Sequence, residues 1–243
     1  MPFYDNYFAR GEISSIGTKI IRREIANRIR LATTLRKKNT LKILELGPGK
    51  GYFARAVMEL GWEYRAIDGS PAVLNALKAY NIEVIHAFVP PIPQNAGGEY
   101  DLVLMEHFIE HMDSPGVARR LIDSICSMLS RDGLIIIVAP DFLAHRENFW
   151  ECDYTHSFVT SVERLRQLLL DCGLEVCHTG YETLGVESSF FTWLVSELTH
   201  ILYMVRLPQA ISVMLNGSSE KSQKWKNVLL RSCVVVGRKR DAV

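Results

Sequence analysis

The segment LELGPGKGYF, residues 44–53, decides the fold of this chain. An apolar run from Lys42 to Leu46 ends at three glycines on alternate positions, Gly47, Gly49 and Gly51, and apolar residues resume directly after them. This order predicts a strand, a tight turn and a helix. Glycine accepts a positive φ and lets a ligand approach the backbone, while the first N–H groups of the helix supply hydrogen-bond donors. The segment is typical of a nucleotide-binding turn.

The spacing of the glycines distinguishes between two classes of cofactor. A dinucleotide-binding turn has the pattern Gly-x-Gly-x-x-Gly, whereas this chain has Gly-x-Gly-x-Gly, with Glu45 two residues before the first glycine. This pattern resembles the first motif of class I S-adenosylmethionine-dependent methyltransferases, whose cofactor has an amino-acid end, a ribose and an adenine but no phosphate. The resemblance implies S-adenosylmethionine as the cofactor, with Glu45, Gly47, Gly49 and Gly51 in its site.

Length and composition predict one α/β domain with additions. The chain has 243 residues, of which 48% are hydrophobic and 23% charged, enough to bury a full core. Its formal net charge of +1 gives no electrostatic case for a nucleic-acid partner. The charge is uneven, because basic residues dominate residues 1–40 and 221–243 and acidic residues dominate the middle. These basic ends are either solvated helix faces or an attraction to an anionic substrate or membrane surface.

The cysteines and the apolar runs predict a cytoplasmic protein. Five cysteines lie scattered through apolar segments without a Cys-x-x-Cys pair, which is typical of reduced thiols. The N-terminus shows no basic segment followed by an apolar one, and no run reaches the ~18 apolar residues of a membrane-spanning helix.

Residues 1–40 are expected to form a lid and an amphipathic helix. Apolar residues recur at helical spacing from Ile16 to Leu35, with basic residues such as Arg22 and Arg30 off that stripe. Before this helix, residues 4–8 include the aromatic Tyr7. Many small-molecule methyltransferases use this segment as a lid, so Tyr7 is a candidate substrate-binding residue; the alternative is a terminal aromatic anchor.

The next two strands are expected to supply the rest of the cofactor site. A strand over residues 64–68 ends in Asp68 and is followed by Gly69. A carboxylate can accept two hydrogen bonds from a cis diol, and in the methyltransferase family the matching acid binds the ribose. After the strand at residues 82–88, many relatives place an acid that holds adenine, which this chain lacks. Adenine is therefore expected at the backbone of Ala87 and Phe88 and against the Phe88 ring.

The strand at residues 100–105 runs into Glu106 and His107, at the edge where ligands of open α/β sheets bind. The resemblance places Glu106 at the cofactor and His111 at the acceptor. His107 and His111 also have the i, i+4 spacing of two metal ligands on a helix, but no His-Glu-x-x-His order and no third ligand accompany them, so no metal is expected. Nucleic-acid methylation is disfavoured because no Asn/Asp-Pro-Pro-Tyr/Phe motif follows this strand.

A long loop over residues 145–160 is the expected acceptor site, since dense polar and aromatic residues at this edge are typical of substrate binding. Its candidate residues are Arg146, Trp150, Asp153, Tyr154 and His156. The segment from Asp153 to His156 is similar to the Asp-x-Thr-His of related methyltransferases, several of which modify sugars or other small hydroxylated acceptors.

The expected reaction is methyl transfer to a hydroxyl or amine of a small-molecule, sugar or lipid-linked acceptor. A hydroxyl acceptor must lose its proton, and a neutral imidazole suits that step. His156 is the first candidate base and His107 the second. The alternative is a regulatory protein that binds S-adenosylmethionine without turnover. The identity of the acceptor and the oligomeric state stay open.

The last part of the chain completes the methyltransferase fold. A strand at residues 174–181 should pair antiparallel with one at 228–237, giving a Rossmann-like, seven-stranded and mostly parallel sheet with one antiparallel strand and helices on both faces. The S-adenosylmethionine-binding core then covers residues 41–181, and residues 228–243 form the last strand and a basic tail. Residues 182–227 form a helical insert expected over the acceptor site; its segment 186–215 could instead lie against a membrane or be plain core.

Overall fold

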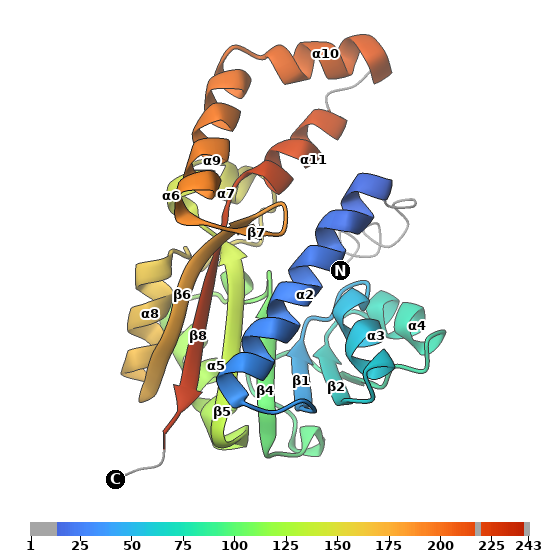
Figure 1. Ribbon diagram of the computed structural model, residues 1–243, viewed down its shortest axis with the longest axis vertical. Coiled ribbons are helices and arrows are strands. Elements are labelled where there is room, and N and C mark those ends of the chain that lie inside the picture. Colours follow the sequence, from blue (N-terminus) through green and yellow to red (C-terminus); the bar gives the residue numbers. More distant parts are fainter. Residues whose placement is uncertain (1–13, 217–219, 241–243) are drawn as a thin grey trace.

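The computed structural model describes residues 14–216 and 220–240, and Figure 1 shows a twisted sheet with helices on both faces and a helical group beyond one end. The helices are α2 Ser15–Arg36, α3 Tyr52–Glu59, α4 Pro71–Lys78, α5 Pro115–Met128, α6 Phe142–His145, α7 Asn148–Glu151, α8 Val162–Asp171, α9 Ser189–Met204, α10 Leu207–Asn216 and α11 Glu220–Leu229, with single 3₁₀ turns η1 Gln94–Ala96 and η2 Ile109–His111. The strands are β1 Lys42–Leu46, β2 Glu63–Asp68, β3 Val84–His86, β4 Tyr100–Glu106, β5 Leu129–Pro140, β6 Leu174–Thr183, β7 Val186–Glu187 and β8 Ser232–Lys239.

The sheet has the order β3-β2-β1-β4-β5-β8-β6-β7. Strands β1 to β5 pair in parallel, and β8 lies antiparallel between β5 and β6. The expected α/β architecture with a mostly parallel sheet is confirmed. The expected count of seven strands with one antiparallel member is wrong, because the described chain forms eight strands and β7 is also antiparallel to its neighbour.

The additional strand arises from a hairpin at the start of the insert. Thr183 pairs with Val186, and the two residues between them, Leu184 and Gly185, have φ values of 55° and 70°. Two residues with positive φ form the tight turn that suits the twist of a hairpin. The sequence did not reveal it because leucine is an uncommon residue in this conformation.

Each face of the sheet carries an apolar layer. On one face, α2 and α3 pack on alternate side chains of the central strands, as Ala32 does in the layer that contains Leu104. On the other face, α5 and α8 supply Leu121 and Leu165 to the layer that contains Val103. Val103 and Leu104 are adjacent on β4, and successive side chains of a strand point to opposite faces, so this strand contributes to both layers. A central strand buried on both faces fixes where its carboxyl end lies.

The insert forms α9, α10 and α11, which extend beyond the sheet in Figure 1. The last strand begins at Ser232 rather than at residue 228, because α11 continues to Leu229. Helix α2 confirms the expected amphipathic helix and crosses the face of the sheet in front of β4 and β5 (Figure 1). In the described residues no helix is both long and apolar enough to cross a membrane.

Candidate functional site

Three acids lie at or next to the carboxyl ends of neighbouring strands. Glu45 lies on β1, Asp68 ends β2 and Glu106 ends β4. Strand β1 stands between β2 and β4, and the chain leaves it outward to β3 before it returns to β4. The strand order reverses at this point, and open α/β sheets bind ligands in the crevice that such a reversal leaves at the carboxyl ends.

The three glycines of the turn have different structural reasons. All have positive φ, of 72° at Gly47, 50° at Gly49 and 66° at Gly51. A Cβ at Gly47 would lie 2.6 Å from the Phe108 ring, and one at Gly51 would lie 2.4 Å from Leu77, so packing excludes a side chain at both. A Cβ at Gly49 would meet no described atom within 4 Å. Gly49 therefore faces the open space that a ligand would occupy.

The residues predicted for ribose and adenine lie together. Asp68 Oδ1 accepts a hydrogen bond from the Ser70 N–H at 2.7 Å, which orients the carboxylate at the end of β2. The Ala87 N–H donates to the Asp68 carbonyl at 3.1 Å, so the two segments meet. The Phe88 ring is 70% exposed and lies against Gly69, where a Cβ would come within 2.5 Å of it. The Phe88 ring, the backbone at Ala87 and the Asp68 carboxylate thus lie together at the carboxyl edge of the sheet.

Glu45 is buried behind the glycine turn. Its Oε2 accepts a hydrogen bond from the Tyr64 hydroxyl at 2.5 Å. Burial raises the pKa of Glu45 to about 8, although the Tyr64 hydrogen bond acts in the opposite direction. Its exposed fraction of 3% means that it supports the turn from inside more than it presents a carboxylate to a ligand.

Arg28 on α2 joins the site, and the sequence analysis missed it. Its Nε donates to Glu106 Oε1 at 2.6 Å, and its Nη2 donates to Glu182 Oε1 at 2.7 Å. The guanidinium and Glu182 are buried, so their ion pair is removed from water, whereas the Glu106 side chain is 27% exposed. Arg28 follows Ile25 by three positions and precedes Ala32 by four, which places it on the apolar stripe. A charge on that stripe was the signal that could have revealed it.

Glu24 stands beside this network. Burial, followed by the carboxylates of Glu182 and Glu106, raises the pKa of Glu24 to about 7. The positive charge of Arg28, and the interaction with His107 when its imidazole is protonated, act in the opposite direction. Perturbed carboxylates at the carboxyl edge of a sheet are typical of functional sites.

His107 and His111 do not share a helical face. His107 follows β4 with a φ of 50°, and its side chain is 60% exposed at the carboxyl edge. Its Nδ1 lies 3.5 Å from Oε1 of the buried Glu110. His111 lies one 3₁₀ turn later and its Nδ1 bonds instead to Thr155 Oγ1 at 2.8 Å. Burial lowers the pKa of His111.

The loop after β5 brings its predicted residues to two places. Asp153 accepts a hydrogen bond from the Thr155 hydroxyl at 2.7 Å, and the His156 ring centroid is 5.0 Å from that of His111. Arg146 instead pairs with Glu197 of α9 at 3.2 Å.

The aromatic residues of this loop differ in exposure. The exposed Trp150 ring packs edge-on against Phe142 and Phe149. Tyr154 is 74% exposed. Tyr7, the predicted lid residue, lies outside the described residues. Of the predicted acceptor residues, Asp153 thus lies beside His111 at η2, whereas Arg146 lies at α9.

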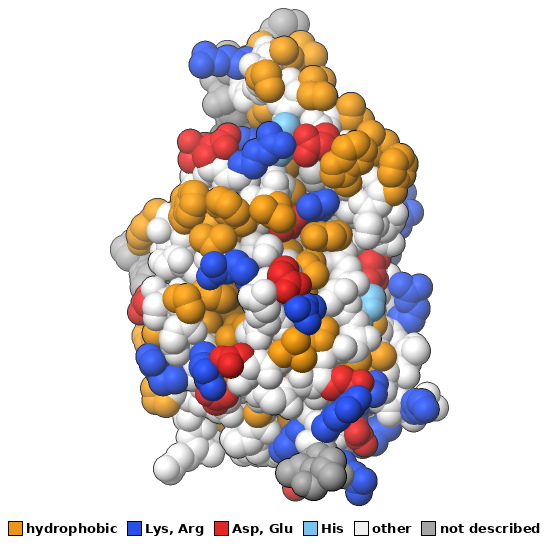
Figure 2. All heavy atoms as spheres, turned by 90° about the vertical axis from the view of Figure 1, so that its left-hand side faces the viewer, with side chains coloured by type: hydrophobic (Ala, Val, Ile, Leu, Met, Phe, Trp, Pro, Cys, Tyr) orange, Lys and Arg blue, Asp and Glu red, His pale blue; other side chains and the backbone are white. Residues whose placement is uncertain are grey.

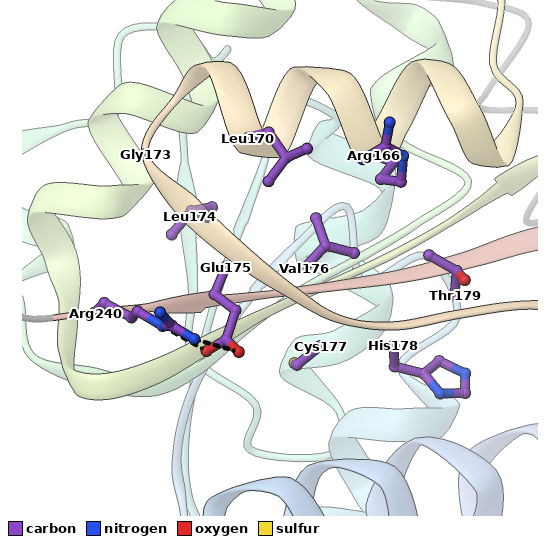
Figure 3. Close-up of a pocket in the computed structure, with 10 residues that line it drawn as sticks. All are labelled: Arg166, Leu170, Gly173, Leu174, Glu175, Val176, Cys177, His178, Thr179 and Arg240. Carbon is purple, nitrogen blue, oxygen red and sulfur yellow. Dashed lines mark hydrogen bonds and ion pairs between the residues drawn. The ribbon is translucent and has the colours of Figure 1, made fainter.

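A hollow of about 820 Å³ lies at the opposite edge of the sheet (Figure 3). It is bounded by α8, the start of β6 and the end of β8, and Figure 3 shows the Glu175 carboxylate paired with Arg240, with an N···O distance of 2.7 Å. The start of β6 and the end of the antiparallel β8 belong to the amino edge of the parallel strands, with Leu174 paired to Lys239. This hollow lies away from the glycine turn and is not part of the candidate site.

Comparison with known proteins identifies the family. A family model described as a methyltransferase domain matches residues 18–179, which is more than half of the chain. The chain therefore belongs to the methyltransferase domain family. It is an S-adenosylmethionine-dependent methyltransferase domain, and S-adenosylmethionine is its cofactor.

Individual relatives agree with this assignment. A glycine/sarcosine/dimethylglycine N-methyltransferase from Actinopolyspora halophila is 30% identical over 112 residues, a stretch that spans 42% of this chain but only 20% of that protein. The structure of magnesium protoporphyrin IX methyltransferase from Synechocystis PCC 6803 with bound SAH has a TM-score of 0.60, with 13% identity over 98% of this chain and 94% of the other. The N-methyltransferase NodS from Bradyrhizobium japonicum WM9 has a TM-score of 0.59, with 12% identity over 91% of this chain and 97% of the other. At these identities the two structures share the fold.

The residues at the carboxyl edge fit S-adenosylmethionine. The open space at Gly49 admits a ligand to the backbone of the turn, and the carboxylate of Asp68 suits a diol. The exposed Phe88 ring suits an adenine.

Proposed function

We propose that this chain transfers a methyl group from S-adenosylmethionine to a hydroxyl or amine of a small-molecule, sugar or lipid-linked acceptor. One observation carries the proposal: His107 is 60% exposed directly after β4, next to the strand ends that carry Asp68 and Glu106. The names of two relatives, the glycine/sarcosine/dimethylglycine enzyme and NodS, place their own reactions on nitrogen, which supports an amine as one acceptor class.

Each cofactor residue has a proposed role. Gly49 leaves room for the amino-acid end of the cofactor, and Asp68 accepts hydrogen bonds from the ribose hydroxyls. Ala87 and Phe88 hold the adenine through the backbone and the exposed ring, with Gly69 leaving space for that ring. Glu45 supports the turn through Tyr64.

Glu106 is held by Arg28, so its carboxylate is fixed at the end of β4, where it would present an oriented charge to the cationic cofactor. Gly47 and Gly51 keep the turn compact against Phe108 and Leu77.

Proton removal falls to His107 rather than to His156. When bound, S-adenosylmethionine supplies an electrophilic methyl carbon on a sulfonium. The chain must hold the acceptor in line with it and take the proton of a hydroxyl. The His156 side chain is 8% exposed, and its Nδ1 is held 2.6 Å from the Phe149 carbonyl, whereas His107 is open to the edge. The exposure of the two rings therefore reverses the order that the sequence favoured.

The loop residues are proposed to line the acceptor cavity. His111 and Asp153 lie on the η2 side, Arg146 pairs with Glu197 of α9, and the side chains of Trp150 and Tyr154 are exposed. Tyr7 stays a proposed lid residue.

Helix α9 is proposed to meet a lipid surface, which would suit a lipid-linked acceptor. Phe190, Trp193, Leu198 and Ile201 are between 48% and 71% exposed, so these side chains do not roof a closed cavity. Figure 2 shows hydrophobic side chains gathered at the end of the molecule that carries the insert. The exposed Arg206 follows α9 and could face anionic headgroups.

The test separates binding from chemistry. Calorimetry should show that Asp68→Ala weakens cofactor binding by about 1.5 to 3 kcal/mol, as for hydrogen bonds to a charged group, and that Gly49→Val also weakens it. His107→Ala should keep that affinity and lower formation of S-adenosylhomocysteine with a hydroxyl acceptor by ~10²-fold or more. If His107→Ala is fully active and His156→Ala is not, the assignment of the base is wrong.

The second candidate is a regulatory protein of the same fold that binds S-adenosylmethionine without turnover. The intact glycine turn and Asp68 are equally compatible with it. Tight cofactor binding without formation of S-adenosylhomocysteine, over amine, sugar and lipid-linked acceptors, would favour this candidate over the enzyme.

A further inference from the structure

Three potential metal ligands come together beside His107. The side chains of Glu110, His111 and His156 each offer one ligand atom, and these atoms lie within 4.8 Å of one another. Glu110 and His111 belong to η2, whereas His156 lies in the loop after α7. The N–H groups of Ser157 and Phe158 both donate to the Glu110 carbonyl at 2.9 Å, so the backbone holds this loop against η2.

Both imidazoles have their Nδ1 atoms engaged. His156 Nδ1 lies 2.6 Å from the Phe149 carbonyl, which only accepts, so this nitrogen carries the proton. Thr155 donates its hydroxyl hydrogen to Asp153, so its Oγ1 accepts the hydrogen bond from His111 Nδ1. The hydrogen-bond network therefore assigns the lone pair of each ring to Nε2. Metal-binding histidines are typically oriented in this way: the ring nitrogen that does not bind the metal donates its hydrogen to a backbone carbonyl, a carboxylate or water.

The Glu110 carboxylate supplies an independent observation. It is completely buried, and neither of its oxygens has a hydrogen-bond partner among the described residues. Its 3.5 Å contact with His107 Nδ1 is an ion-pair distance without hydrogen-bond geometry. A buried carboxylate without hydrogen bonds is costly unless a cation compensates it. A cation among Glu110, His111 and His156 would provide that compensation.

We propose that Glu110, His111 and His156 form a binding site for a divalent transition-metal ion of the Zn²⁺ type. Two imidazole nitrogens and one carboxylate oxygen are the ligands that such an ion prefers, and three protein ligands leave a further coordination position for water or an acceptor atom. The ion would also fix the loop of residues 152–158 on η2, next to the proposed base. The sequence expectation of no metal started from the pair His107 and His111, found no third ligand for it, and took Glu110 and His111 as a pair that also occurs in relatives without metal.

The test measures Zn²⁺ binding by the full chain and needs no acceptor. After removal of metals with a chelator, competition with a chromogenic chelator should show one tight Zn²⁺ per chain. His111→Ala, His156→Ala and Glu110→Gln should each weaken this binding by ~10²-fold or more. His178→Ala is the matched control, because His178 Nε2 also lies on a carboxylate, 2.5 Å from Glu187, but belongs to no group of three potential ligands among the described residues.

Several outcomes would overturn the proposal. Wild-type protein that binds no stoichiometric Zn²⁺ rejects the site whether or not the variants fold. His111 is the least buried of the three ligands, so unchanged affinity in a folded His111→Ala rejects the ligand set.

A further measurement identifies the ligand atoms. A thiolate charge-transfer band on Co²⁺ substitution would replace the proposed set with one containing Cys152, whose Sγ is 3.9 Å from His156 Nδ1. Loss of binding in His145→Ala would likewise assign the metal to that buried imidazole instead. A Co²⁺ spectrum without that band, together with retained affinity in His145→Ala, supports the three ligands.

Discussion

Helices α2 and α9 are both amphipathic in sequence, yet they present opposite faces to the protein. Helix α2 turns its apolar stripe to the sheet and buries Arg28 within it. Helix α9 buries small polar side chains, Thr192, Ser196 and Thr199, and leaves its large apolar side chains exposed. An apolar stripe thus predicts a helix but not which side of the helix is inside, because burial also depends on which partner lies within reach.

The polar contacts explain the orientation of α9. The Ser196 hydroxyl accepts a hydrogen bond from the Arg231 N–H at 3.2 Å, and His200 Nε2 lies 2.6 Å from the Ala144 carbonyl. Small side chains allow the helix to approach α6 and the start of β8 closely. The apolar side chains on the opposite face of α9 are therefore exposed, as is typical of an interaction surface.

The largest expected change in stability follows removal of the buried charge of Arg28 on α2. Arg28→Ala should lower the free energy of unfolding by about 3 to 5 kcal/mol, because the buried Glu182 and the partly buried Glu106 would lose their cationic partner. Chemical denaturation measures this difference. Arg30→Ala, at an exposed position of the same helix, is the control and should change stability by less than ~0.5 kcal/mol. Equal effects in the two variants would show that the network contributes no stability.

Glu24 on the same helix gives a pH-dependent test. Its pKa in the folded protein is raised to about 7, with burial as the main cause, so folding favours the protonated form and stability from this group is lost as the pH rises from about 4.5 to about 7. Glu24→Gln removes that loss and should be more stable than the wild type at pH 8 by about 2 to 3 kcal/mol, with little difference at pH 4. Thermal unfolding of both proteins at the two pH values decides the matter, and a difference that does not grow with pH would contradict it.

A pair of substitutions on α9 tests its reversed orientation. Ser196→Leu should destabilise the protein by about 1 to 3 kcal/mol, since it overfills a buried position and removes the acceptor of the Arg231 N–H. Leu198→Ser, on the exposed face, should change stability by less than ~0.5 kcal/mol. Urea unfolding compares them. If Leu198→Ser proves the more damaging, the apolar face of α9 is part of the core after all.

The smallest expected effect on stability belongs to Trp193→Glu. This side chain is 48% exposed, so the unfolding free energy should stay within ~0.5 kcal/mol of the wild type. The intact protein should sediment with anionic liposomes, and Trp193→Glu should release it. Leu170→Glu on α8, at a comparably exposed apolar position, is the control that should still sediment. Wild-type protein that stays in the supernatant would reject a lipid partner.

The sequence by itself determined the parts of the protein that depend on neighbouring residues. The glycine turn, the all-apolar central strands and the acids at strand ends are local patterns, and periods of 2 and 3.6 fix which positions share a face. These patterns were sufficient for the fold and for placing Asp68 and Glu106 at the ends of their strands. The unexpected hairpin at Leu184 escaped them because its turn uses a residue that rarely adopts a positive φ.

Only the tertiary structure decided which distant residues meet. Arg28 reaches Glu182, 154 positions away along the chain, and His111 reaches Thr155, 44 positions away. The first contact is buried and the second is partly buried, and a polar group in such a position needs a partner from whichever segment the fold brings there. The periodic pattern of a helix does not predict that partner, because the partner is selected by the free energy of contacts between distant segments and not by contacts within one segment.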